Sequence, residues 1–324
     1  MNKLSYIDLF CGIGGFRQAL DSRGHQCVFS SDWDPHAQWV YQKNYGETPF
    51  GDVSKLPDSE VPVHDLLCGG FPCQPFSISG NQLGFEDARG TLLHEILRIV
   101  KVRKPAVVLL ENVKNYRTHD LGRTHAMTLE LLGKAGYSVF DQILNSSNFG
   151  VPQKRERLFF VGFRKDLQIS QFTFPSPLSV DIALEDILLP EEDPCLEELI
   201  ISRDDVKWKE KQPATRKNRP LRIGTVGKGG QGERIYSVKG HAVTLSAYGG
   251  GIGAKTGMYL VGNRIRRLHP EECKRVMGFP KEFILHEKRN VSYKQFGNSV
   301  AVPVISAIAE RIENVLAIMG KQVA

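Results

Sequence analysis

The sequence predicts an α/β protein with a doubly wound, Rossmann-like sheet and an inserted, smaller and mostly β domain. Two observations carry this prediction. Up to about residue 163, short apolar runs alternate with helical periodicity, a pattern typical of strands joined by helices. Twelve of the 31 glycines then lie between Gly224 and Gly262 among β-branched and aromatic residues, which indicates strands and tight turns rather than a flexible linker.

The elements of the first domain follow in order along the chain. Periodicity predicts strands at 4–10, 27–30, 63–68, 106–110, 139–144 and 158–163, with helices at 14–22, 35–45, 91–103 and 124–135. A shift to Pro-rich, charged sequence marks a boundary near residue 185, and apolar residues from Ile305 to Leu316 repeat at helical spacing. We therefore expect a first domain over 1–185 completed by a helix at 298–324, a second domain over 186–269 and a hinge over 270–297.

Length and composition exclude several classes of protein. At roughly 150 residues per domain, 324 residues suggest two domains, and 41% apolar with 24% charged residues is typical of an ordinary globular protein. No apolar run reaches the roughly 18 residues of a membrane span, and the N-terminus lacks a signal-peptide pattern, so we expect a cytoplasmic protein without a membrane partner. The six cysteines form no CxxC pair and no metal pattern, which predicts reduced thiols and no metal.

Charge is unevenly distributed along the chain. The net charge is +6, but residues 181–200 carry eight acidic and no basic side chains, whereas 203–239 carry eleven basic and four acidic ones. A solvated charged face and a phosphate-binding surface both explain such a basic segment.

A glycine-rich turn follows the first strand, from Asp8 to Phe16. Glycines between a strand and a helix let a ligand approach the backbone, but the dinucleotide pattern G-x-G-x-x-G fails because its last position is Arg17. Asp32 ends the second strand, where a carboxylate can hold ribose hydroxyls, and Asp52 follows a further element. An adenosyl ligand without phosphates, such as S-adenosylmethionine, fits these features; an ordinary βα turn remains the alternative.

Cys73 differs from the other five cysteines, which are expected to be small buried hydrophobic residues. It lies in Gly-Phe-Pro-Cys-Gln-Pro directly after the strand ending at Cys68. Flanking prolines reject regular structure there and place the thiol on a loop at the carboxyl end of a strand, where nucleophiles are presented.

Two further polar groups end or begin predicted strands. Glu111 ends an apolar strand, and a buried carboxyl at such a position is expected to have a raised pKa and to act as a proton donor. Arg155 and Arg157 precede the next strand and are expected at the same edge of the sheet.

Five motifs occur in one order: Phe-x-Gly-x-Gly-Gly from Phe10, Gly-Phe-Pro-Cys-Gln, Glu-Asn-Val, Gln-Lys-Arg-Glu-Arg and Gln-Phe-Gly-Asn-Ser to Ser299. This set resembles the bacterial DNA (cytosine-5)-methyltransferases of restriction-modification systems over nearly the whole chain. The segments from Val226 to Ser237 and from Thr244 to Gly251 are similar to the target-recognition region of such enzymes. The resemblance implies the methyltransferase fold, with residues 186–269 as the target-recognition domain.

The resemblance also implies catalytic roles. Cytosine C5 is too electron-poor to accept a methyl group unless a nucleophile first adds at C6, so Cys73 is expected to form a covalent adduct there. Glu111 would stabilise the charge that develops at N3, and Arg157 would contact O2. Arg155 would hold the loop or lower the pKa of Cys73.

Further roles follow from the same resemblance. The cofactor S-adenosylmethionine is expected to contact Phe10, Gly12, Gly14, Asp32, Trp33, Asp52 and Asn298. Many family members have glutamate at the position of Asp32, so its reach to the ribose is one methylene shorter. Trp33 could favour the adenine or, by cation–π attraction, the sulfonium.

Double-stranded DNA is the expected partner. The target base must be flipped out of the duplex, because attack on C6 comes from above the ring. Ser79 and Gln231 would fill the space that the base leaves. Arg234 would contact guanine or phosphate, and Tyr248 would lie against DNA. The likeness of the recognition region predicts a target containing GCGC. A cognate restriction endonuclease is the expected functional counterpart, without required contact, and we expect a monomer.

Two rival functions remain: an RNA cytosine-5 methyltransferase using the same adduct chemistry, and a non-catalytic DNA-binding protein that has kept the fold. The long glycine-rich insert favours duplex DNA over RNA. Mere binding would not need Cys73, Glu111, Arg155 and Arg157. A dehydrogenase is a distant third.

Overall fold

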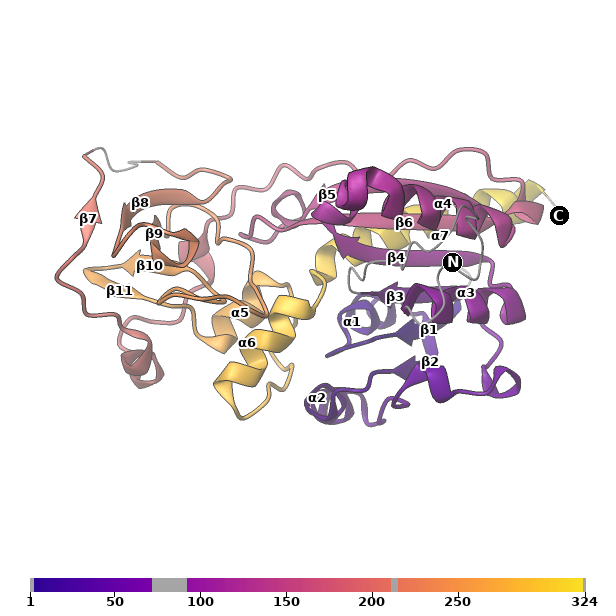
Figure 1. The fold of residues 1–324 in the computed structure, drawn as a ribbon, viewed down its shortest axis with the longest axis horizontal. Coiled ribbons are helices and arrows are strands. Elements are labelled where there is room, and N and C mark those ends of the chain that lie inside the picture. Colours follow the sequence, from indigo (N-terminus) through magenta and orange to yellow (C-terminus); the bar gives the residue numbers. More distant parts are fainter. Residues whose placement is uncertain (1–2, 72–91, 211–214, 323–324) are drawn as a thin grey trace. The chain divides into compact units, whose positions relative to one another are not determined.

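The computed structural model describes residues 3–71, 92–210 and 215–322, and the chain divides into two units that are each discontinuous in sequence (Figure 1). The first unit holds residues 1–144, 156–176 and 305–324, and the second holds 145–155 and 177–304. This division differs from the expected one, because the expected hinge at 270–297 and the short segment 145–155 both belong to the second unit.

The first unit is built on a six-stranded sheet of order β2-β1-β3-β4-β6-β5. The bounds are β1 Ser5–Leu9, β2 Gln26–Ser31, β3 Leu66–Gly70, β4 Val107–Val113, β5 Tyr137–Asn145 and β6 Glu156–Arg164. Strands β1 to β4 pair in parallel, which confirms the predicted α/β architecture. Their carboxyl ends therefore meet at one edge, where ligands bind in such sheets.

The parallel pairing of β1 to β4 does not extend to β6. β6 pairs antiparallel with β4, from Val107 opposite Phe163 to Val113 opposite Arg157. The connection from β5 to β6 holds no α-helix, and a return by a long helical crossover is what parallel pairing requires. The antiparallel register brings the start of β6 to the end of β4.

Helices cover both faces of this sheet. Helices α3 Leu92–Arg103 and α4 Arg123–Lys134 pack their apolar faces on alternate strand residues, including Ile7 and Leu110. The other β1 residues, Tyr6 and Asp8, face the opposite side, which carries α1 Gly15–Asp21. Helix α2 Pro35–Tyr45 begins where the sequence predicts it, with proline at its first position.

The C-terminal helix belongs to the first unit from Ile305 onward, as expected from its periodicity. α7 spans Val302–Gln322, and its buried Glu313 accepts hydrogen bonds from Arg23 at 2.6 and 2.8 Å. Among the described residues, α7 and the other helices include none with the length and apolar character that a bilayer span requires.

The second unit contains a five-stranded sheet of order β11-β10-β9-β8-β7. Its bounds are β7 Lys207–Trp208, β8 Leu221–Thr225, β9 Arg234–Ser237, β10 Met258–Val261 and β11 Arg264–Arg266, followed by helices α5 Pro270–Val276 and α6 Arg289–Asn298. A small apolar cluster that includes Ile223, Ile235 and Met258 forms its core. The glycine-rich segment is thus folded, as its aromatic and β-branched residues predict.

Candidate active site and cofactor turn

The glycine-rich turn after β1 holds three residues in the left-handed region, Phe10 (φ 56°), Gly12 (φ 55°) and Gly14 (φ 82°). Glycine adopts this backbone at little cost. A Cβ on Gly12 would meet no atom within 4 Å, whereas one on Gly14 would come within 2.5 Å of the Tyr45 ring. The turn is therefore open on its Gly12 side and closely packed on its Gly14 side.

Asp32 lies beside this turn, and its carboxylate accepts hydrogen bonds from backbone amides. Its carboxylate accepts the Gly12 N–H at 2.8 Å and the Asp34 N–H at 2.9 Å. Trp33, next to it, is 83% exposed and offers an unobstructed aromatic face.

Asp52 lies at the N-terminus of the short helix Val53–Lys55, where its side chain accepts from the Ser54 N–H and hydroxyl group at 3.0 and 2.7 Å. These hydrogen bonds lower the pKa of Asp52 and keep it ionised. Asp32 thus follows β2, and Asp52 follows the segment after α2, as the sequence analysis expects.

Asp8 is a residue that the sequence analysis did not single out. It is fully buried on β1, and neither of its carboxyl oxygens completes a hydrogen bond within the described part of the chain. Burial raises the pKa of Asp8 to about 8, against the opposing charge of Arg17. An acidic residue inside the apolar run from Leu4 to Phe10 was the available signal.

We expect Asp8→Asn to gain stability relative to the parent as the pH rises. Between pH 4 and 8 the native parent holds a proton that its unfolded state releases, because the folded pKa of about 8 lies above the ordinary value of 3.8. Parent stability therefore falls through this window, whereas asparagine does not ionise. Urea unfolding at pH 5 and pH 8 should show the free-energy difference moving by about 1 kcal/mol or more in favour of the variant.

Asp52→Asn is the matched control for this pH dependence. The pKa of Asp52 is lowered, so its replacement should give no relative gain between pH 5 and 8. A pH-independent difference between Asp8→Asn and the parent would contradict the raised pKa.

Glu111 and Arg157 form a buried ion pair at the end of β4. The Arg157 Nε lies 3.0 Å from Glu111 Oε1, and the two side chains are 14% and 10% exposed. The antiparallel register of β4 and β6 places the arginine two residues from the position opposite Glu111. Burial lowers the pKa of Arg157, and the Glu111 carboxylate opposes that effect. The structure thus brings together two of the predicted catalytic residues.

The backbone just after β3 is hydrogen-bonded to the end of β4 that carries Glu111. The Phe71 N–H donates to the Glu111 carbonyl at 3.3 Å, and the Asn112 amide donates to the Phe71 carbonyl at 2.7 Å. Cys73 follows Phe71 by two residues, but Cys73 and Ser79 lie outside the described residues.

Arg155 belongs to the second unit, whereas Arg157 belongs to the first. It is 2% exposed and donates to the carbonyls of Leu245 at 3.0 Å, Gly297 at 2.9 Å and Ser299 at 2.6 Å. These bonds brace the end of α6, where Asn298 is exposed between two of the acceptors. The two roles expected of Arg155 towards the loop of Cys73 stay predictions, because that loop lies outside the described residues.

Three of the predicted DNA-facing residues lie in or beside two glycine-rich loops of the second unit. Gln231 is exposed and Arg234 half-buried at the start of β9, and Tyr248 is 74% exposed. The loops pack backbone to backbone, since the Gly253 N–H donates to the Gly232 carbonyl at 2.8 Å and a Cβ on Gly232 would come within 2.2 Å of the Gly250 carbonyl oxygen. Glycine is required at that contact.

The comparisons with known proteins agree with this arrangement. The family model for C-5 cytosine-specific DNA methylases matches residues 4–314. The chain belongs to that family. It is 50% identical to the type II methyltransferase M.HhaI of Haemophilus parahaemolyticus over 95% of this chain and 94% of that protein. It is 43% identical to the type II methyltransferase M.NgoBI of Neisseria gonorrhoeae, over 93% and 90% respectively.

The fold of this cytosine-5 DNA methylase also has solved neighbours. The methyltransferase EhMeth of Entamoeba histolytica aligns with a TM-score of 0.74 at 18% identity, covering 98% of this chain and 99% of that one. At such identity the likeness establishes the methyltransferase fold alone, which confirms the predicted fold class.

Proposed function

We propose that this cytosine-5 DNA methylase is the modification enzyme of a type II restriction-modification system. It transfers a methyl group from S-adenosylmethionine to C5 of a flipped-out cytosine in a short duplex target. The buried Glu111–Arg157 pair at the end of β4 carries the proposal, because its carboxyl and guanidinium groups can hydrogen-bond the polar atoms of an electron-poor pyrimidine. Phe71, which is hydrogen-bonded to the Glu111 backbone, precedes Cys73 by two residues.

The chain's own residues supply the activation of the base. The Cys73 thiolate adds to C6, forming a carbon–sulfur bond and moving electron density towards C5 and N3. Glu111 donates a proton or hydrogen bond at N3, and Arg157 a charge-assisted hydrogen bond at O2. After methylation a base removes the C5 proton, the electron pair of that bond re-forms the C5–C6 double bond, and the carbon–sulfur bond breaks with release of the thiolate. A proton transferred to N3 returns to Glu111. Bound S-adenosylmethionine supplies the electrophilic methyl group.

The first unit offers a suitable place for that cofactor. The open face of Gly12, the exposed ring of Trp33 and the carboxylates of Asp32 and Asp52 fit an adenosyl group without phosphates. The other proposed cofactor residues are Phe10 and Gly14 of the first unit and Asn298 of the second.

The second unit supplies the proposed recognition of DNA. Gln231 and Ser79 would fill the space left by the flipped base, Arg234 would contact guanine or phosphate, and Tyr248 would lie along the duplex. The likeness of the two glycine-rich segments, 226–237 and 244–251, to the target-recognition region of such enzymes supports a target containing GCGC. A restriction endonuclease of the same specificity would be the counterpart, and the enzyme would act as a monomer.

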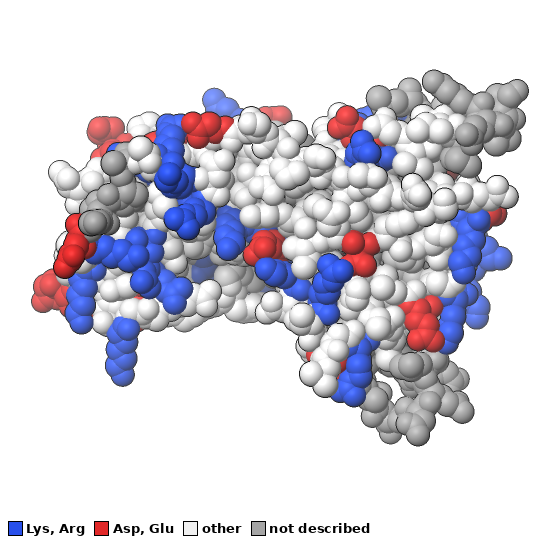
Figure 2. All heavy atoms as spheres, turned by 90° about the horizontal axis from the view of Figure 1, so that it is seen from above, with Lys and Arg blue, Asp and Glu red and all other residues white. Residues whose placement is uncertain are grey.

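Basic side chains support a phosphate-binding surface on this unit. Figure 2 shows Lys and Arg gathered over the part of the chain that includes β7 and β8. The exposed ones are Arg203, Lys207, Lys209, Arg216, Lys217, Arg219, Arg222, Lys228 and Lys239. Part of the acidic run pairs with arginines of the same unit, as Glu185 and Asp186 do with Arg216. The exposed basic side chains on this unit suit contact with the phosphates of a polyanion.

We expect duplex affinity to fall roughly 10²- to 10³-fold between 50 and 200 mM salt, as for about five phosphate contacts. Lys228→Gln should reduce the slope of log affinity against log salt by about one. Arg216→Gln is the control, because two carboxylates already neutralise Arg216, and it should change the slope less. Fluorescence anisotropy measures both, and a flat salt dependence would contradict a phosphate-binding surface.

Bisulfite sequencing of plasmid DNA from cells that express the chain tests the proposed function. We expect protected cytosines confined to one short sequence containing GCGC. Protection at another sequence would refute the target, and no protected cytosine would favour a non-catalytic DNA-binding protein. Methyl transfer to matched RNA but not DNA would favour the RNA enzyme.

A further inference from the structure

The glycine turn is bound by α2 and by the segment just before that helix. Just before the helix, Asp32 accepts the Gly12 N–H at 2.8 Å. In its last turn, the Tyr45 hydroxyl donates to the Gly14 carbonyl at 3.0 Å, and the Tyr45 ring fills the space that a Cβ on Gly14 would need. The position of Tyr45 therefore sets how the turn is held on the side away from the open face of Gly12.

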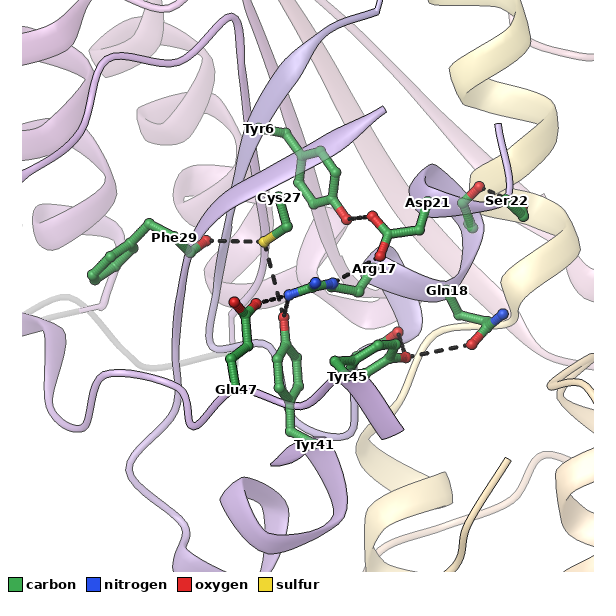
Figure 3. Close-up of polar contacts among 12 residues, drawn as sticks. Tyr6, Arg17, Gln18, Asp21, Ser22, Cys27, Phe29, Tyr41, Tyr45 and Glu47 are labelled. Atoms are coloured by element: carbon green, nitrogen blue, oxygen red, sulfur yellow. Dashed lines mark hydrogen bonds and ion pairs between the residues drawn. The ribbon is translucent and has the colours of Figure 1, made fainter. Parts of the chain in front are cut away.

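Arg17 in turn holds Tyr45 (Figure 3). Its guanidinium carbon lies 4.9 Å from the centre of the Tyr45 ring and 5.5 Å from that of Tyr41. It donates to the Tyr41 hydroxyl at 3.1 Å and to Asp21 at 2.8 Å, and it pairs with Glu47. The side chain is only 12% exposed, so these contacts form largely out of solvent, where they are stronger.

The contacts of Arg17 with Asp21, Tyr41 and Glu47 use the planar fork of its guanidinium group. Asp21 also accepts from the Tyr6 hydroxyl of β1 at 2.6 Å, and the Tyr41 and Tyr45 rings lie 4.6 Å apart. Arg17 thus joins β1, α1 and α2 through several donors that point in different directions. A lysine ammonium keeps the charge but loses the fork and the stacking plane.

We propose that Arg17 is a positioning residue for the cofactor turn, acting through Tyr45 on the Gly14 carbonyl. The inference rests on the proposed function, in which this turn binds S-adenosylmethionine. Arg17 touches neither the cofactor nor the base; it keeps three left-handed residues in the arrangement that presents the open side of the turn. The cost of its loss appears in cofactor affinity and not in the methyl-transfer step.

Calorimetric titration of the full chain with S-adenosylmethionine tests this directly. Arg17→Lys should raise the Kd about 5- to 20-fold, because several hydrogen bonds and a stacking contact weaken. Tyr45→Phe, which keeps the ring but removes the bond to Gly14, should raise it about 5-fold. Steady-state assays should show the KM for the cofactor rising in parallel, while kcat and the Kd for duplex DNA stay within about twofold.

Arg23→Lys is the matched control. Arg23 follows the same helix and is bound to Glu313 by two hydrogen bonds, but it does not contact the turn. Thermal unfolding of all variants measures the purely structural effect. We expect Arg23→Lys to lower the Tm without changing cofactor Kd.

Three results would overturn the inference: an Arg17→Lys Kd within about twofold of the parent, an equal rise in Arg23→Lys, or a fall in kcat with unchanged cofactor Kd. Failure of the proposed function is distinguishable, because the parent chain itself would then bind no S-adenosylmethionine.

Discussion

Replacing Cys73 with serine is expected to lower methyl transfer to duplex DNA by roughly 10³-fold or more. A hydroxyl group ionises far less readily than a thiol, so the addition at C6 that makes C5 nucleophilic would almost cease. Binding of duplex DNA should be preserved, because the proposed recognition residues Gln231, Arg234 and Tyr248 lie far from Cys73 in the sequence, in the second unit. Transfer of labelled methyl groups in a single turnover measures the loss.

A second measurement isolates the covalent step. With cofactor present, an oligonucleotide carrying 5-fluorocytosine should form a denaturation-resistant conjugate with the parent chain, because fluorine at C5 blocks the proton loss that releases the enzyme. Cys73→Ser should form none. Cys195→Ser is the control, since Cys195 is a partly exposed cysteine of the second unit, and it should behave as the parent. A Cys73→Ser variant that methylates at the parental rate would refute the nucleophile.

Glu111→Gln is expected to lower the single-turnover rate about 10²- to 10³-fold. The amide oxygen can still accept from Arg157 Nε, which lies 3.0 Å from the present carboxylate, so the local geometry should persist. What is lost is the ability to transfer a proton to N3 and so neutralise the charge that develops on the ring. Cofactor Kd and duplex Kd should change little.

Glu156→Gln provides the comparison for that variant. Glu156 begins β6 beside Arg157 but pairs with the exposed Lys114, so its replacement should leave the rate within about threefold. A Glu111→Gln variant equally close to the parental rate would remove Glu111 from the mechanism.

Much of the first unit follows from local sequence signals. Asp34 and Pro35 form the N-cap and first turn of α2, and the apolar run from Leu4 to Phe10 gives β1. The strand predicted from Val63 begins only at Leu66, and Val63 is 79% exposed. Apolar character alone therefore misplaced that strand boundary.

Contacts between distant residues were beyond such signals. The sequence analysis placed Arg155 and Arg157 at one edge, but the structure commits Arg155 to three carbonyls of residues 245–299 and Arg157 to Glu111. It likewise expected Asp32 to face ribose, whereas Asp32 also holds the Gly12 amide. Arg17 entered only as the residue that breaks a dinucleotide pattern.

The sequence by itself determined the order of the elements, the motifs that identify the family and the residue types available for chemistry. These are local properties, set by periodicity, turn-forming residues and short spacings. Only the tertiary structure decided that β6 runs antiparallel to β4, that Glu111 therefore meets Arg157, and that Arg17 reaches the glycine turn through Tyr45. Each depends on residues 28 or more positions apart, whose approach is decided by strand register and burial rather than by any pattern along the chain.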